Sequence, residues 1–228
     1  MLMSEVSVNE IPKDVLSPGK IDEILRSRKV QFMIKRLFDI VASLTGLVIL
    51  LPVFLVVAVA IKLDSEGPVF FRQVRVGKDG KNFKIYKFRT MVVNAEKKGE
   101  QITVEGDRRI TGIGHFLRKY KIDELPQLIN VLRGDMSIVG PRPEVPKYVA
   151  MYDENQRSIL RIRPGITDLA SIEYKDENSI LAKSDNPEKT YVEEIMPRKI
   201  ELNFEYIKNI SIAYDIKLIL KTIFRIIK

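Results

Sequence analysis

The chain has 228 residues, no cysteine and one histidine, and its 38 Lys plus Arg outnumber 30 Asp plus Glu, for a net charge of +8. This length allows one domain with a sizeable core and a few appended elements. The lack of cysteine excludes a disulfide framework, thiolate catalysis and cysteine-based zinc sites. With His115 as the only histidine and no partnered nucleophile near it, we set aside a Ser-His-Asp hydrolase. The positive charge favours an anionic partner, such as nucleic acid, an acidic membrane face or a phosphorylated substrate.

A hydrophobic segment runs from Ile40 to Ile61, 22 residues without a charge, which is long enough to cross a membrane. Pro52 removes a backbone donor and clashes with the preceding turn, so we expect a bend there. The proline leaves arms of 12 and 9 residues, each about half as long as the hydrocarbon core is thick.

The sequences on both sides of this segment are basic. Residues 20–36 carry six Lys or Arg against two acids, and residues 62–89 carry eight against three. By the positive-inside rule, both flanks face the cytoplasm. The pattern favours a re-entrant helix that bends at Pro52, while a kinked transmembrane helix and a buried core helix remain alternatives.

Two alternating runs of β-branched and aromatic residues follow, "PVFFRQVRV" and "NFKIYKFRT", and they flank "GKDGK". An Asp-Gly pair between such runs indicates a hairpin, so residues 68–90 are predicted to form two antiparallel strands. Strand alternation puts Lys87 and Arg89 on one face, where they are candidates for binding a phosphate group. A solvated basic edge strand is the alternative, because charges also protect sheet edges from pairing.

"KIDELPQL" places two adjacent carboxylates, Asp123 and Glu124, in a basic neighbourhood. The residues that follow predict a short helix with Asp123 near its N-cap, Pro126 in the first turn and Gly134 just beyond its end. Backbone N–H groups at a helix start favour an ionised carboxylate and can also hold phosphoryl oxygens. Taken alone, an Asp at the N-cap followed by Glu is also a common capping pattern at the start of a helix.

Two segments rich in glycine and proline, "GDMSIVGPRPEVP" and "RIRPGIT", are predicted to be loops. The first presents Asp135 and Arg142, and the second presents Arg161 and Arg163. Guanidinium groups on stiff loops suit bidentate phosphate binding, although each alone is equally a surface ion-pair partner. Residues 172–194 are polar and rich in acids, and we interpret them as a loop or a partner surface.

The last residues, "DIKLILKTIFRIIK", predict a basic amphipathic helix. Lys217, Lys221, Arg225 and Lys228 recur every three or four residues, and apolar side chains fill the rest of the surface. Such a helix can lie at the interface of an anionic leaflet, with its basic side chains reaching the headgroups. The alternative is a helix that packs on the core and keeps a solvated basic face.

Several motifs occur in a fixed order along the chain: "KRLFDIV", "GPVFFRQVRVGKDGKNFKIYKFRTM", "DRRITGIGHFLRK", "DELPQLINVLRGDMSIVGPRPE", "RPGIT" and "YIKNISIAYDIKLILKTI". Together they resemble the bacterial sugar transferase family, and within it the monotopic phosphoglycosyl transferases, which are polyprenyl-phosphate sugar-1-phosphate transferases. The resemblance covers roughly Lys35 to Ile223. A run of motifs this long is far more specific than any one of them.

The resemblance implies an α+β fold, namely a helix-rich monotopic membrane enzyme with a re-entrant helix broken at Pro52, a small β-hairpin and interfacial amphipathic helices. We expect a polar or interfacial N-terminal segment over residues 1–34, the re-entrant helix over 35–62, and a cytoplasmic catalytic domain with the C-terminal amphipathic helix over 63–228. With no large membrane domain before Lys35, we expect a compact form, essentially a catalytic unit with its membrane attachments. The implied location is the cytoplasmic face of the bacterial inner membrane.

Members of that family transfer a sugar 1-phosphate from a UDP-sugar to undecaprenyl phosphate and release UMP, which begins the membrane stage of surface glycoconjugate assembly. They require Mg²⁺. The resemblance implies that Asp123 is the nucleophile that forms a covalent sugar-phosphoryl-aspartate, and that Glu124 helps to hold the metal. The substrate-binding residues that it implies are Lys87, Arg89, Arg118, Asp135, Arg142 and Arg163.

The implied partners are the UDP-sugar donor, undecaprenyl phosphate and membrane lipid. Downstream glycosyltransferases and a second copy of the chain are further candidates, and no nucleic acid partner is expected. A non-catalytic membrane-surface scaffold of the same family is the alternative function, and the intact Asp-Glu pair counts against it. "DLASIEYKDEN" replaces a segment that is frequently "GWAQVNGRN" in the family, so the sequence leaves the identity of the sugar open.

Overall fold

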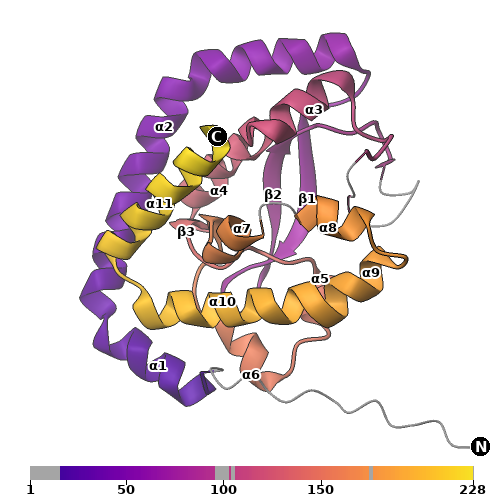
Figure 1. Ribbon diagram of the computed structural model, residues 1–228. Coiled ribbons are helices and arrows are strands. Elements are labelled where there is room, and N and C mark those ends of the chain that lie inside the picture. Colours follow the sequence, from indigo (N-terminus) through magenta and orange to yellow (C-terminus); the bar gives the residue numbers. More distant parts are fainter. Residues whose placement is uncertain (1–15, 96–102, 104–105, 175–176, 228) are drawn as a thin grey trace, which may run out of the picture.

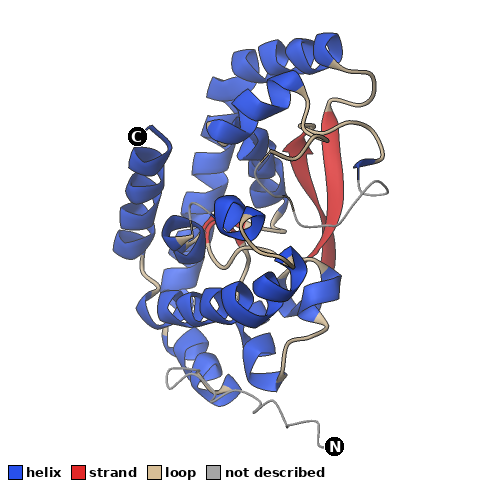
Figure 2. Ribbon diagram, turned by 45° about the vertical axis from the view of Figure 1, so that its right-hand side comes forward, coloured by secondary structure: helices blue, strands red, loops and turns tan. Residues whose placement is uncertain are grey.

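The computed structural model of the protein describes residues 16–95, 103, 106–174 and 177–227. Helices dominate these residues, and two small sheets of two strands each complete the fold (Figures 1 and 2). The expected α+β class is therefore confirmed.

The helices are α1 (Pro18–Ser27), α2 (Lys29–Asp64), α3 (Gly112–Lys119), α4 (Leu128–Arg133), α5 (Pro146–Val149), α6 (Glu154–Arg157), α7 (Leu169–Glu173), α8 (Glu177–Ala182), α9 (Pro187–Thr190), α10 (Met196–Asn209) and α11 (Ile212–Ile227). The strands are β1 (Phe70–Val76), β2 (Asn82–Phe88), β3 (Ser137–Val139) and β4 (Gly165–Thr167). Short 3₁₀ helices occur at Lys78–Gly80, Ile122–Gln127 and Ser158–Arg161, and a π-helical turn at Tyr191–Ile195.

Helix α2 contains the whole predicted membrane segment and has Pro52 inside it. Figure 1 shows two arms that meet at a steep bend, and the second arm contacts α3. An interior proline accounts for such a bend, because it removes a hydrogen bond and crowds the preceding turn. Within the described residues, α2 is the one helix long and apolar enough to cross a membrane, and most of its large apolar side chains are exposed. Whether α2 re-enters or spans a bilayer stays a prediction.

Polar contacts attach the first arm of α2 to the rest of the protein. Lys35 and Asp215 of α11 form a buried ion pair with 2.6 Å between nitrogen and oxygen. The Asp39 carboxylate, also buried, accepts a 3.0 Å hydrogen bond from the backbone N–H of Ile138 in β3. The start of α2 is therefore held against β3 and α11.

A buried cation helps to attach the other end of α2. The buried guanidinium of Arg89 donates to the backbone carbonyls of Ile61, Ser65 and Glu66. Carbonyl groups at a helix C-terminus lack intrahelical donors, and a positive charge there interacts favourably with the negative end of the helix dipole. Arg89 thus caps α2 at the point where the chain leaves the helix.

The predicted hairpin is confirmed, because β1 and β2 pair antiparallel along their whole length. Asp79 and Gly80 at its tip have positive φ values of 56° and 73°, which suits the Asp-Gly pair. Phe88 is almost fully buried and packs on Phe70 and on Phe54 of α2, with ring centroids 5.5 and 5.2 Å apart. The hairpin therefore lies against the second arm of α2.

Strands β3 and β4 show that two predicted loops are wrong, because parts of these segments form a short parallel sheet. The N–H of Gly140 donates to the Thr167 carbonyl over 3.0 Å, and the N–H of Gly165 donates to the Pro141 carbonyl over 2.9 Å. A Cβ atom on Gly165 would lie 2.1 Å from the Gly140 nitrogen. The glycines that suggested loops instead allow two backbones to approach closely.

The interpretation of residues 172–194 as a loop is also wrong. The described part of this stretch is mostly helical, with the end of α7, then α8, α9 and most of the π-helical turn. Leu181 and Tyr191 are buried, and the Asn186 side chain caps α9 by accepting from the Lys189 N–H over 3.0 Å. A few apolar residues were therefore enough to anchor α8 and the π-helical turn to the core, whereas α9 has no buried residue.

Helix α11 confirms the predicted helix at the end of the chain. Its Lys217 and Lys221 are exposed, and so are the apolar side chains of Leu220 and Phe224. Leu218 is fully buried against the core. The side chain of Lys228 lies outside the described residues. Exposed apolar and basic groups on one helix are compatible with an interfacial position, which stays a prediction.

The hydrophobic core of the described residues has one large cluster and two small ones, of which one is formed by Ile85, Val131 and Met136. The large cluster joins α5, α7, α10 and the buried side of α11, with Phe204 and Tyr206 of α10 among its most buried side chains. A smaller cluster joins the second arm of α2 to β2 and α3 through Ile61, Phe88 and Leu117. The site described below lies where β2, the 3₁₀ helix after α3 and the residues after β3 meet.

We predict that Gly165→Ala lowers the free energy of unfolding by about 2 kcal/mol, because the added methyl group must push apart two paired backbones. Gly19→Ala in α1 is the matched control: nothing lies within 4 Å of its added methyl group, and alanine favours a helix. Urea unfolding of the detergent-solubilised protein, followed by circular dichroism, measures both changes. Equal stabilities of the two variants would contradict the close pairing of β3 and β4.

Candidate active site

The two adjacent carboxylates lie in the 3₁₀ helix Ile122–Gln127 rather than at the start of an α-helix. The expected N-cap role of Asp123 is wrong, because Lys121 occupies the cap position in a left-handed conformation, with φ at 56°. The Lys121 carbonyl accepts from the Glu124 N–H over 3.2 Å. Consecutive side chains in a 3₁₀ helix diverge by about 120°, so the two acids point into different surroundings. The predicted end of the following helix at Gly134 is confirmed, with φ at 91°.

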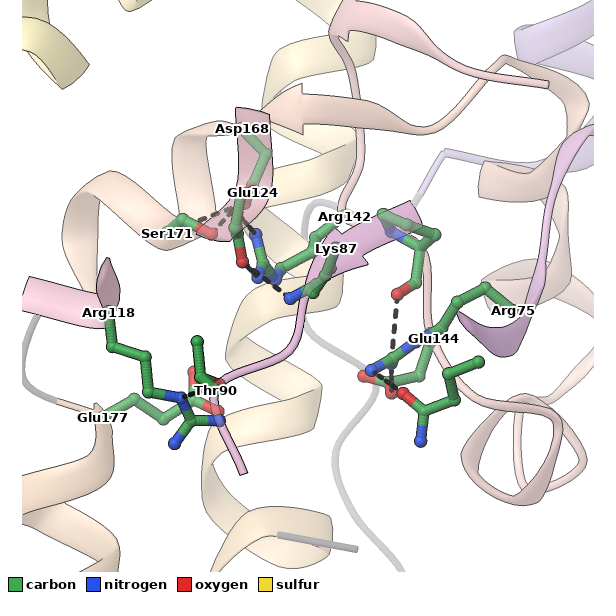
Figure 3. Close-up of polar contacts among 12 residues, drawn as sticks. Arg75, Lys87, Thr90, Arg118, Glu124, Arg142, Glu144, Asp168, Ser171 and Glu177 are labelled. Atoms are coloured by element: carbon green, nitrogen blue, oxygen red, sulfur yellow. Dashed lines mark hydrogen bonds and ion pairs between the residues drawn. The ribbon is translucent and has the colours of Figure 1, made fainter. Parts of the chain in front are cut away.

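Glu124 is buried and held by two cations from other elements (Figure 3). Its Oε1 accepts from Lys87 Nζ over 2.8 Å and from Arg142 over 2.5 Å, and its Oε2 accepts from Arg142 over 3.3 Å. Burial alone would raise the pKa of Glu124, but Arg142 and then Lys87 outweigh it and hold the pKa well below its usual range. Glu124 is therefore ionised and paired.

Asp123 is in the opposite situation. Its side chain is buried, and within the described residues its Oδ1 atom has no hydrogen-bond partner. Burial raises the pKa of Asp123, the neighbouring charge of Glu124 raises it further, and Lys87 and Arg118 act against both. Asp123 therefore presents an unsatisfied carboxylate oxygen next to a cluster of cations.

Arg118 supplies a third cation near the two acids. Its Nε donates to the Thr90 hydroxyl over 3.1 Å, and within the described part of the chain its terminal nitrogens have no hydrogen-bond partner. Burial lowers the pKa of Arg118, and the charge of Asp123 opposes that change. A guanidinium fixed at one nitrogen and open at the others suits a phosphate group.

The structure thus brings together five of the predicted site residues, which are Lys87, Arg118, Asp123, Glu124 and Arg142. Lys87 comes from β2, Arg118 from α3, the two acids from the 3₁₀ helix, and Arg142 from the segment after β3. Burial lowers the pKa of Lys87, and Glu124 opposes that change. Lys87 forms an ion pair with Glu124 from the hairpin, and its predicted role in substrate binding stays a prediction.

The other three predicted residues contact different groups. Arg89 caps α2, Asp135 accepts a hydrogen bond from the Asn130 side chain over 3.2 Å, and the Nε of Arg163 donates to the Gly134 carbonyl over 2.9 Å. Within the described residues, none of the three forms a hydrogen bond or an ion pair with either acid. Their roles in substrate binding stay predictions.

A buried network beside this cluster was not predicted. Arg75 of β1 pairs with Glu144 over 3.3 Å (Figure 3). The Tyr191 hydroxyl also donates to Glu144. Burial raises the pKa of Tyr191, and Glu144 raises it further, so the hydroxyl keeps its proton. Arg75 also interacts electrostatically with Arg142. The available signal was an arginine inside an apolar strand, which needs a partner that sequence spacing does not reveal.

The metal-binding capacity of this site is limited. The described residues contain no group of three or more His, Cys, Asp or Glu side chains that could hold a metal by themselves. Two adjacent carboxylates, one with an unpartnered oxygen, nevertheless fit Mg²⁺, which is usually bound by one or two carboxylates together with substrate phosphates. The donor set therefore fits a metal that binds together with a phosphorylated ligand.

Comparison with known proteins identifies close relatives. A family model described as "Bacterial sugar transferase" matches residues 30–228. A UDP-N-acetylgalactosamine-undecaprenyl-phosphate N-acetylgalactosaminephosphotransferase from Aeromonas hydrophila is 40% identical over 226 residues, which cover 97% of this chain and 50% of that protein. A UDP-glucose:undecaprenyl-phosphate glucose-1-phosphate transferase from Escherichia coli (strain K12) is 39% identical over 203 residues, which cover 86% of this chain and 40% of that protein.

A shorter relative matches over nearly its whole length. The exopolysaccharide production protein PSS from Rhizobium leguminosarum bv. phaseoli is 40% identical over 203 residues, which cover 85% of this chain and 95% of that protein. The chain spans half or less of the two longer relatives, so the matched region is the part that all of them share.

We predict that Asp123→Asn raises the free energy of unfolding at neutral pH by about 1 kcal/mol, because it removes an ionised, unsatisfied carboxylate from a buried position. The raised pKa of Asp123 means that the folded wild type gains stability when this group takes up a proton. The advantage of the variant should therefore shrink as the pH falls through the folded-state pKa of Asp123. Denaturant unfolding at several pH values measures it.

Glu124→Gln is the matched control and should have the opposite sign. It leaves Lys87 and Arg142 without their anion, so the free energy of unfolding should fall by about 3 kcal/mol at neutral pH. Because the folded-state pKa of Glu124 is depressed, the advantage of the wild type should disappear only as the pH falls through that low pKa. The same sign for both variants at neutral pH would contradict the different surroundings of the two acids.

Proposed function

The chain belongs to the bacterial sugar transferase family, and we propose on that basis that it transfers a sugar 1-phosphate from a UDP-sugar to undecaprenyl phosphate and releases UMP. The reaction would begin the membrane stage of surface polysaccharide assembly. The names of the relatives refer to N-acetylgalactosamine in one case and to glucose in another, so the sugar remains open.

The observation that carries this proposal is that two adjacent carboxylates have different surroundings. Glu124 is neutralised by two cations, whereas Asp123 is buried with one oxygen unpartnered among the described residues. A carboxylate without hydrogen-bond donors keeps more of its basicity and is a better nucleophile toward phosphorus. The site therefore offers one acid for attack and one for charge balance.

The proposed reaction has two displacement steps at one phosphorus atom. In the first step, an oxygen of Asp123 bonds to the sugar-linked phosphorus of the donor, and the bond from that phosphorus to the bridging oxygen breaks, so UMP leaves. In the second step, a phosphate oxygen of undecaprenyl phosphate attacks the same phosphorus and displaces the Asp123 carboxylate. The lipid then carries the sugar through a diphosphate, and the carboxylate is regenerated.

The cations of the site have a clear place in this reaction. The terminal guanidinium nitrogens of Arg118 have no hydrogen-bond partner among the described residues, whereas Lys87 and Arg142 are paired with Glu124. Positive groups fixed in advance stabilise the charge that develops on phosphoryl oxygens. Glu124 would help to hold Mg²⁺ together with the donor diphosphate, and the metal would supply further charge neutralisation.

The membrane placement is also part of the proposal. The exposed apolar surface of α2, its bend and its basic flanks support a re-entrant helix at the cytoplasmic face of the inner membrane. α11 would lie at the interface beside it. This placement puts the water-soluble donor and the phosphate of the lipid acceptor on the same side of the bilayer as Asp123 and Glu124.

We predict that Asp123→Asn reduces UMP release by roughly 10⁴-fold or more, because the amide cannot form the phosphoryl bond. Asp79→Asn at the exposed hairpin tip makes the same chemical change away from the site and should leave the rate unchanged. The assay uses full-length protein, undecaprenyl phosphate, a panel of UDP-sugars and Mg²⁺, and chelation of the metal should stop it. Rapid quenching with sugar-labelled donor and no acceptor should capture labelled wild-type protein.

The products decide between this proposal and two others. UDP instead of UMP would indicate transfer of the sugar alone. No turnover of any donor in the panel would favour a non-catalytic membrane-surface scaffold. An active protein that never carries the label, even without acceptor, would contradict the covalent step through Asp123.

For the topology, we predict that sites on both sides of the apolar segment are accessible from the cytoplasm. The chain has no cysteine, so Arg26→Cys and Lys81→Cys, both at exposed positions, each introduce a single reactive thiol. An impermeant reagent applied to intact cells should label neither thiol, and the same reagent applied to inverted membrane vesicles should label both. Labelling of the two thiols from opposite sides would establish a spanning helix instead.

A further inference from the structure

A cavity of about 370 Å³ lies apart from the two acids, between α1, the first arm of α2, β3, the residues before β4 and α10. None of the five residues gathered at the candidate active site lines it. Its volume is in the range of cavities that hold small ligands. The function proposed above gives it no role.

The cavity is strongly cationic. Its charged lining residues are Lys29, Lys35, Arg36, Lys78, Arg161 and Arg163, with Asp39 as the acid among them. Two of these cations are neutralised by acids, because Lys35 pairs with a buried Asp215 and Arg161 pairs with Asp22. The other four cations and the Asp39 carboxylate leave an excess of three positive charges.

None of these four cations forms an ion pair with a carboxylate of the described residues, although the charge of Asp39 acts on Arg36. Arg36 donates to the backbone carbonyls of Val131 and Leu132 over 2.7 and 3.1 Å, and Arg163 also donates only to a carbonyl, so both keep a full charge. Lys29 and Lys78 are exposed and form no hydrogen bond or ion pair with the described residues. The cavity therefore has charge available for an anion.

A buried hydroxyl points to a ligand as well. Ser137 is 1% exposed and lines the cavity, and its Oγ atom has no hydrogen-bond partner among the described residues. A buried hydroxyl without a partner costs free energy, and a phosphate oxygen would be a good acceptor for it.

The apolar part of the lining continues onto the surface of α2. Phe32 and Met33 line the cavity, and Met33 is 72% exposed. Ile34 and Leu37 are also exposed and follow Met33 along the same arm, in the direction of the predicted membrane segment. The cavity is therefore joined to a surface suited to acyl chains.

We propose that this cavity binds one anionic phospholipid, with its phosphodiester among Lys29, Lys78 and Ser137 and its acyl chains along the exposed face of α2. The charge selects an anionic headgroup, and the continuous apolar surface selects a lipid over a free phosphate ion. The lipid acceptor of the proposed reaction fits less well, because its phosphate must reach Asp123, which does not line the cavity. A bound lipid would fix the first arm of α2 at the level of the headgroups.

The test measures lipid binding to the full-length protein in neutral detergent, without any donor, so that it does not depend on the proposed transfer reaction. Native mass spectrometry counts bound molecules during titration with dioctanoyl phosphatidylglycerol, dioctanoyl phosphatidylcholine or inorganic phosphate. We expect one phosphatidylglycerol per chain, bound at least about tenfold more tightly than phosphatidylcholine. Equal affinity for the two lipids would overturn the proposal.

Variants assign the binding to the cavity. Lys29→Gln with Lys78→Gln should weaken phosphatidylglycerol binding by about tenfold. Lys81→Gln with Lys84→Gln is the matched control, because both lysines are exposed and neither lines the cavity, and it should leave the affinity unchanged. Ser137→Ala should weaken binding several-fold without unfolding the protein, because the hydroxyl has no partner to lose.

Other results would contradict the assignment. The same loss in both lysine pairs would mean that binding follows net charge alone. Competition by inorganic phosphate at the same concentration as the lipid would show an anion site without a lipid component. Displacement of phosphatidylglycerol by stoichiometric undecaprenyl phosphate would reassign the cavity to the acceptor.

Discussion

The site depends on the buried Glu124 carboxylate, because it is the point where separate parts of the fold meet. Lys87 reaches it from the hairpin and Arg142 from the segment after β3, while Glu124 itself is fixed in a 3₁₀ helix. Each cation alone would be an unpaired buried charge, and each therefore requires Glu124. These cations pair with Glu124, whereas the Oδ1 of the adjacent Asp123 has no hydrogen-bond partner among the described residues.

Helix α2 is attached to this arrangement by polar contacts on both arms and by an apolar cluster on its second arm. Asp39 accepts from β3, Lys35 pairs with α11, and Arg89 caps the second arm directly after β2. Since Lys87 and Arg89 lie two residues apart, the strand that supplies a cation to Glu124 also supplies the cap of α2. The short stretch from Lys87 to Arg89 therefore links Glu124 to the end of α2 and fixes how the two acids lie relative to that helix.

The sequence predicted those elements of the structure whose pattern lies within a short stretch of the chain or within a family motif. The hairpin followed from an Asp-Gly turn, α11 from its periodicity, and the cluster around the two acids from motifs shared with a family. The β3–β4 pair could not be predicted, because it rests on the contact of Gly140 with Gly165 across distant parts of the chain. Strand alternation put Lys87 and Arg89 on one face but could not show that one reaches Glu124 and the other caps a helix.

If the proposed function is right, the charge of the site gives a reason for the donor diphosphate and Mg²⁺ to bind together. Lys87, Arg118 and Arg142 oppose Asp123 and Glu124, which leaves an excess of one positive charge in a buried region. A donor diphosphate adds two negative charges, and a divalent cation adds two positive ones. The diphosphate bound alone would change the net charge of the site from +1 to −1, and the divalent cation bound alone would change it to +3. The two bound together would leave the net charge at +1. Because uncompensated charge is costly where water is excluded, binding of each should favour binding of the other. Under the proposed function, such linkage would let Glu124 and the donor diphosphate hold Mg²⁺ together without a cluster of three acidic ligands.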